Sequence, residues 1–167
     1  LPDFFNGLLQ QSFQFLFGEI YDQNGNERFQ LSESLRLRVI RFFLSCLEKV
    51  DGLSNFIEII MKIVFRIATK EIEIEEVNKE SDTQDYEKCV IFSKMSCFVI
   101  IDLDEFILYS NSIKVLTLIF KKNEQFLPIY AEQIYNLTMK LLKNQYFKDD
   151  SILSDVFEFS KFCFMTI

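Results

Sequence analysis

The sequence predicts an all-α protein of six to seven helices packed as antiparallel pairs. Four glycines and two prolines in 167 residues are too few for the frequent turns of a β-sandwich or barrel. Apolar residues recur at the spacing of one helix face along most of the chain. The 49% apolar and 26% charged residues exclude a disordered chain. We therefore expect one helical domain over residues 1–167, either an open solenoid of helix pairs or a compact helical bundle.

The first three helices are expected at residues 3–21, about 32–50, and 54–70. Ser32 or Ser34, and then Ser54, are candidate N-caps, and Gly52 ends the second helix. The short connection through Gly52 predicts that the second and third helices are antiparallel neighbours. Charged residues every four positions predict the solvated face of the third helix: Glu58, Lys62, Arg66 and Lys70.

Residues 71–87 contain eight acidic residues and one basic residue. Their alternating start is compatible with a strand, but no second strand is expected to pair with it. We therefore expect the third helix to continue for a turn or two, followed by an acidic loop over about 71–85. Asp82 or Thr83 is then the candidate cap of a fourth helix, which reaches Ile101 and is apolar on most sides.

Three more helices are expected in the remaining chain. A break near Asn111 begins the fifth helix, and the segment 121–123, which holds two lysines, ends it, because cations suit a helix C-terminus. Pro128 fits the first turn of the sixth, and Asp149 or Asp150 caps the seventh. No strict internal repeat is present, only a rhythm of helix pairs.

The composition argues against an enzyme. Without a single histidine, the chain has neither the usual base of a Ser or Cys nucleophile nor a histidine ligand for a metal. Its scattered glycines do not form a phosphate-binding loop. We expect no enzymatic activity, no cofactor and no metal. An enzyme that relies on carboxylates alone is an alternative, but the cluster at 102–105 is better interpreted as a polar turn.

The cysteines and the charge bear on the setting of the protein. Each of the four cysteines lies in an apolar run and none forms a Cys-x-x-Cys pair, which predicts buried, reduced thiols: Cys46, Cys89, Cys97 and Cys163. We expect an intracellular protein, cytoplasmic or nuclear. The net charge of −7 argues against a nucleic-acid partner, and no segment is apolar enough for a membrane span.

Two groups of residues are candidates for protein binding. Arg36, Arg38 and Arg41 lie close together in the second helix and can dock an acidic peptide, a phosphate or an anionic lipid. Arg36 is offset from the other two by about 200° in an ideal helix, and pairing with local glutamates is the simpler interpretation. The second group lies in the apolar C-terminal run, which needs a covering surface: Phe157, Phe162 and Phe164.

A family resemblance accompanies these patterns. The segment from Asp85 to Met95, DYEKCVIFSKM, with the helices expected at 113–120 and 129–142, resembles HEAT-type α-solenoids of importin-β/exportin-like transport receptors. The resemblance covers about residues 82–145 and implies a role in protein transport. The regular Pro, Asp and Arg positions of such repeats are absent, so no functional residue is carried over.

The expected function is a non-catalytic helical scaffold or protein-binding segment. Its partner is a protein or adjoining helices of the same chain, because the start at Leu1 and the apolar terminal helices suggest a piece of a longer protein. A small viral or regulatory bundle that binds a partner helix in a groove is the alternative. The sequence leaves the oligomeric state open.

Overall fold

The computed structural model describes the chain except for residues 1–2, 51–52, 71–73, 78–88, 94–97, 144–149 and 167. Its elements, in chain order, are α1 (Asp3–Phe15), the π-helical turn η1 (Leu16–Ile20), α2 (Glu33–Lys49), α3 (Ile57–Thr69), β1 (Ile74–Val77), β2 (Cys89–Ser93), β3 (Phe98–Asp102), α4 (Leu103–Lys122), the 3-10 turn η3 (Glu124–Phe126), α5 (Ala131–Lys143) and α6 (Asp150–Thr166). The predicted predominance of helix is confirmed in the described residues.

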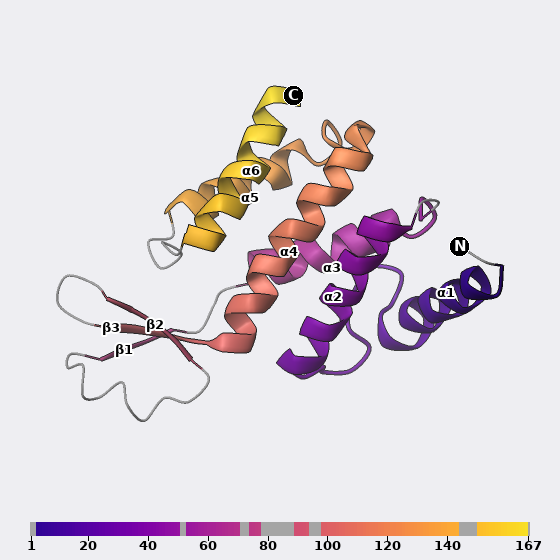
Figure 1. The fold of residues 1–167 in the computed structure, drawn as a ribbon, viewed down its shortest axis with the longest axis horizontal. Coiled ribbons are helices and arrows are strands. Elements are labelled where there is room, and N and C mark those ends of the chain that lie inside the picture. The colour runs from indigo at the N-terminus through magenta and orange to yellow at the C-terminus, as the bar shows by residue number, and fades with distance from the viewer. Residues whose placement is uncertain are drawn as a thin grey trace.

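Helix α4 lies at the centre of the molecule (Figure 1). Helices α2, α3 and α6 all pack on it, and α5 packs on α6 and α3. The expected pairing of the second helix with the third is therefore not the main contact, since both pack more extensively on α4 than on each other. The reason is that α4 is buried on nearly every side and accepts the apolar stripe of each neighbour.

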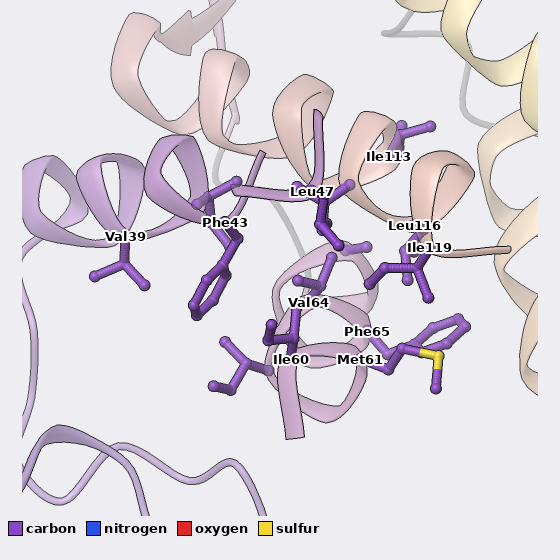
Figure 2. Packing of buried hydrophobic residues seen from close by; sticks show 14 of the residues in the cluster. Val39, Phe43, Leu47, Ile60, Met61, Val64, Phe65, Ile113, Leu116 and Ile119 are labelled. Carbon is purple, nitrogen blue, oxygen red and sulfur yellow. The ribbon is translucent and has the colours of Figure 1, made fainter. Parts of the chain in front are cut away.

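The core is formed where α2, α3 and α4 meet (Figure 2). Side chains from all three helices converge there, and their predicted stripes are largely confirmed. The fully or nearly fully buried members include Phe43 and Leu47 of α2, Ile60, Met61 and Val64 of α3, and Ile113, Leu116 and Ile119 of α4. The predicted solvated row of α3, from Glu58 to Lys70, is exposed. Burial of this apolar surface is the main force that holds the helices together.

A three-stranded antiparallel sheet corrects the expected helix and loop between residues 71 and 101. The strand order is β1-β3-β2, and β3 pairs Ile101 with Ile74 of β1 and with Val90 of β2. The predicted fourth helix is wrong at 89–93 and 98–101, and β1 lies within the expected acidic loop. Valine, isoleucine and phenylalanine favour strands, and a short run that is apolar on all sides has no period to separate strand from helix.

The predicted break near Asn111 is also wrong, because α4 continues through it. Asp102 caps this helix, its Oδ1 accepting the Glu105 amide at 3.1 Å, so the carboxylates at 102–105 begin a helix rather than form a turn. Within α4, Ser112 Oγ donates to the Leu108 carbonyl at 2.7 Å. Such a bond to the preceding turn lets a buried hydroxyl stay within a helix.

The other predicted helix boundaries agree with the structure in part: the first helix changes to a π-helical turn after Phe15, and Gly52 and Asp149 lie outside the described residues. Ser32 caps α2, its Oγ accepting the Leu35 amide at 3.2 Å, and α4 ends at Lys122 as expected. Ser54 makes no cap, because α3 begins three residues later without a side-chain cap. Pro128 lies in the turn before α5 rather than in its first helical turn. None of the helices in the described ranges combines the length and apolarity needed to cross a bilayer.

Candidate functional site

Arg36 is held between two carboxylates and is separate from the other two predicted arginines. Its Nε and Nη2 donate to Glu27 at 2.7 and 2.8 Å, and its Nη1 donates to Glu33 at 2.7 Å. The simpler interpretation of this arginine, pairing with a local glutamate, is therefore confirmed. Its guanidinium fastens the start of α2 to the preceding loop.

The ion pair shifts the protonation equilibria of both partners. Burial alone would raise the pKa of Glu27, but hydrogen bonds from Arg36 and the Leu31 amide outweigh it and hold this pKa below its ordinary value. The hydrogen bond to Glu27 raises the pKa of Arg36 against the opposing effect of burial. Because the folded-state pKa of Glu27 is lowered, the pair stabilises the fold above the ordinary carboxyl pKa and is lost as the pH falls.

Glu27→Gln is expected to lower the free energy of unfolding by about 1–2 kcal/mol at pH 7, since the pair is only partly buried. Because the contribution of the lowered Glu27 pKa is lost progressively as the pH falls below the ordinary carboxyl pKa, the difference between variant and wild type should be smaller at pH 3. Urea unfolding at both pH values measures this. Glu48→Gln, at an exposed position on α2, is the control and should have little effect. An equal loss for Glu27→Gln at both pH values would contradict the assignment.

Arg38 and Arg41 lie on another side of α2 and are both exposed. Among the described residues, neither makes an ion pair or a side-chain hydrogen bond. The offset of Arg36 predicted from helical geometry is therefore confirmed. Of the three predicted arginines, Arg36 therefore has a structural role, whereas Arg38 and Arg41 are exposed and unpaired in the part of the chain that the structure describes.

A groove of about 470 Å³ lies beside Arg38, between α1 and α2. One wall is the α1 stripe that begins at Leu8 and reaches Phe15, and these two side chains are 61% and 58% exposed. The opposite wall comes from α2. The full lining is Leu8, Gln11, Ser12, Phe15, Leu16, Arg38, Val39 and Phe42. The two helices thus border an open, largely apolar groove with a cation at its edge.

Phe13 fixes α1 in this position. Its ring is fully buried and stacks on Phe56 with centroids 4.8 Å apart. It also lies 5.4 Å from the ring of Phe42 in α2. Since successive faces of a helix point in different directions, burial of Phe13 leaves the Leu8–Phe15 stripe facing the groove.

The C-terminal phenylalanines divide between two faces of α6. Phe157 and Phe164 are 59% and 67% exposed, and seven residues separate them, which places them on one side of the helix. Phe159 on the other side is buried, with its ring 6.3 Å from Phe120 of α4. The Phe162 side chain lies outside the described ones.

The thiols are not poised for reaction. Burial raises the pKa of Cys46 and of Cys163 to about 11, so both stay protonated at neutral pH. Cys89 is half-buried rather than buried as predicted, and Cys97 lies outside the described residues. In the ranges that the structure describes, no three cysteine or carboxylate side chains are placed to hold a metal ion.

Sequence reasoning identified Arg38 but missed the α1 wall of the groove. The periodicity of residues 3–21 predicts an apolar face, and it assigns Leu8 and Phe13 to the same wide arc. The unusual width of that arc indicates a second apolar surface on this helix, because a single interior surface cannot cover the whole arc.

Comparison with known proteins adds no assignment. No protein-family model matches this sequence, and no curated protein sequence is significantly similar to it.

Proposed function

We propose that this chain is a non-catalytic protein-binding scaffold whose α1–α2 groove holds an amphipathic helix of a partner protein. The partner helix carries acidic residues beside its apolar stripe. The observation that supports this proposal is the open apolar groove with the exposed Arg38 on its α2 wall, while the exposed Arg41 lies one turn further along the same helix. The resemblance to transport receptors agrees with protein binding but assigns no partner.

The apolar walls have the spacing that a helix requires. Leu8 and Phe15 are two turns apart on α1, and Leu35 and Phe42 repeat the same interval on α2, although Leu35 is not part of the groove lining. A partner helix in such a groove presents apolar side chains at positions i, i+3, i+4 and i+7. Covering Leu8 and Phe15 would stabilise a complex by about 1.5–3 kcal/mol for each side chain that becomes fully buried.

The charges favour an acidic partner helix over a second copy of this chain. Arg38 lines the groove, and Arg41 is one turn further along α2. In a twofold dimer through this surface, the same arginines of both copies would approach one another. Carboxylates on a partner helix instead complement them, which sets orientation and excludes basic partners.

A pair of designed helical peptides tests the proposal. Both are about 14 residues long with one leucine stripe, flanked by glutamates in one peptide and by lysines in the other. Fluorescence anisotropy is expected to show saturable binding of the acidic peptide and at least about 10-fold weaker binding of the basic one. Leu8→Asp should abolish binding without unfolding the protein, since Leu8 is mostly exposed.

Charge reversal supplies the matched control. Arg38→Glu is expected to lower the affinity for the acidic peptide about 10-fold. Lys161→Glu, at an exposed position on α6, should leave that affinity unchanged. Equal binding of both peptides would contradict the proposed partner chemistry. Sedimentation that shows a dimer, lost on Leu8→Asp, would replace the partner helix with a second copy of the chain.

A further inference from the structure

A second cavity, about 260 Å³ in volume, lies on another side of α2. Four parts of the chain form it: the 21–27 segment and helices α2, α3 and α4. Its lining includes Tyr21, Arg66, Lys70, Ile63, Ile67 and Leu108. It shares no lining residue with the α1–α2 groove, so it is independent of the proposed function.

Tyr21 lines this cavity, and its buried hydroxyl has an unmet hydrogen-bonding capacity. Tyr21 is only 1% exposed, and its hydroxyl has no hydrogen-bond partner in the described structure. Burial and the nearby Glu27 carboxylate raise its pKa, so the group is a protonated donor. Both charged groups that act on it, Glu27 and Arg36, also line the cavity. A buried donor without an acceptor is destabilising unless a bound molecule supplies one.

Two cations at the cavity also lack a full counter-charge. Arg66 donates only to neutral oxygens of the described residues, the Gly25 carbonyl and the Asn26 side chain. The ion pair of Lys70 is with Glu33, Nζ lying 3.6 Å from Oε1, and that oxygen already accepts from Arg36. Glu27 and Glu33 both pair with Arg36, and the third lining carboxylate, Glu105, lies in the first turn of α4, so Arg66 and Lys70 are the lining cations that can pair with a ligand. The cavity therefore favours an acceptor-rich, negatively charged ligand.

We propose that this cavity binds a small monocarboxylate with an apolar body. The carboxylate accepts hydrogen bonds from Tyr21 and pairs with Arg66 or Lys70, while the apolar body packs on Ile63, Ile67 and Leu108. A singly charged ligand is favoured over a phosphate dianion, because three glutamates also line the cavity: Glu27, Glu33 and Glu105. The volume of the cavity is near the lower end of the range for small-molecule sites, so the ligand has to be compact.

Phenylacetate is a suitable probe, with phenylacetamide and phenethylamine as its neutral and cationic counterparts. Titration of the ¹⁵N-labelled protein with phenylacetate is expected to give saturable amide shifts at Ile63, Arg66 and Leu108. Phenylacetamide should bind at least about 10-fold more weakly, since it cannot form the charge-assisted bonds. Phenethylamine should produce no saturable shift at these amides.

Tyr21→Phe keeps the ring and removes the donor. This variant is expected to bind phenylacetate about 10-fold more weakly. Without ligand, its urea midpoint of unfolding should be higher than that of the wild type, because the hydroxyl that it removes is buried without a partner in the described structure. Arg66→Gln should also weaken binding, whereas Lys62→Gln, one turn earlier on the exposed face of α3, should not. Equal affinity for phenylacetate and phenylacetamide, or an unchanged affinity in Tyr21→Phe, would overturn the proposal.

Discussion

Phe120→Ala is expected to lower the free energy of unfolding by about 3–5 kcal/mol, a large part of the 5–15 kcal/mol typical of a domain. Phe120 is fully buried and connects three elements to α4. Its ring centroid lies 6.2 Å from Phe65 of α3, 6.5 Å from Tyr130 before α5, and 6.3 Å from Phe159 of α6. Truncation leaves a cavity at the point where these elements meet.

Urea unfolding followed by circular dichroism measures this loss. Phe164→Ala removes the same side chain at a position that is 67% exposed and should change stability by about 0.5 kcal/mol or less. If Phe120→Ala does not fold, Phe120→Leu retains most of the volume and should lose only about 1–2 kcal/mol. Similar small losses for the alanine variants at 120 and 164 would contradict the described core.

Gly25→Ala is expected to destabilise the fold by about 2–3 kcal/mol, through both backbone strain and crowding. Gly25 has a φ of +75°, a backbone conformation that residues other than glycine rarely adopt. An added Cβ would lie 3.0 Å from the Cβ of Lys62 and 3.2 Å from the backbone nitrogen of Ile63. The loop would have to move away from α3, which would also disturb the Arg66 bond to the Gly25 carbonyl.

Gly18→Ala is the matched control, because a Cβ at Gly18 meets nothing within 4 Å. Its effect should be neutral or stabilising by up to about 1 kcal/mol. Thermal unfolding of both variants measures the difference. The described turn is incorrect if Gly25→Ala is as stable as the wild type.

The helices of the core could be predicted because local patterns determine them. The stripes of α2 and α3 each combine a regular apolar period with a charged opposite face, and Ser32 begins α2 where capping rules place it. The sheet could not be predicted in the same way. Strand pairing between β1 and β3 joins segments about 25 residues apart, and nothing in either segment alone indicates its partner.

The candidate site could be predicted only in part, for a related reason. Helical geometry alone separates Arg36 from Arg38, because both lie on the same helix. The other wall of the groove depends on how α1 docks through Phe13, which is a tertiary contact. The cavity beside Tyr21 depends on four separate parts of the chain, so no window of sequence contains it.

The central position of α4 has a consequence for the order of synthesis. Helices α2 and α3 precede it in the chain, yet α4 is the surface on which both pack. Between the end of α3 at Thr69 and the end of α4 at Lys122, 53 residues (122 − 69) have to be added. At the usual 5–20 residues per second, the apolar stripes of α2 and α3 stay uncovered for about 3–10 s until α4 has been synthesised. During translation this protein therefore exposes its future core to chaperones and to neighbouring nascent chains before its central helix has been made.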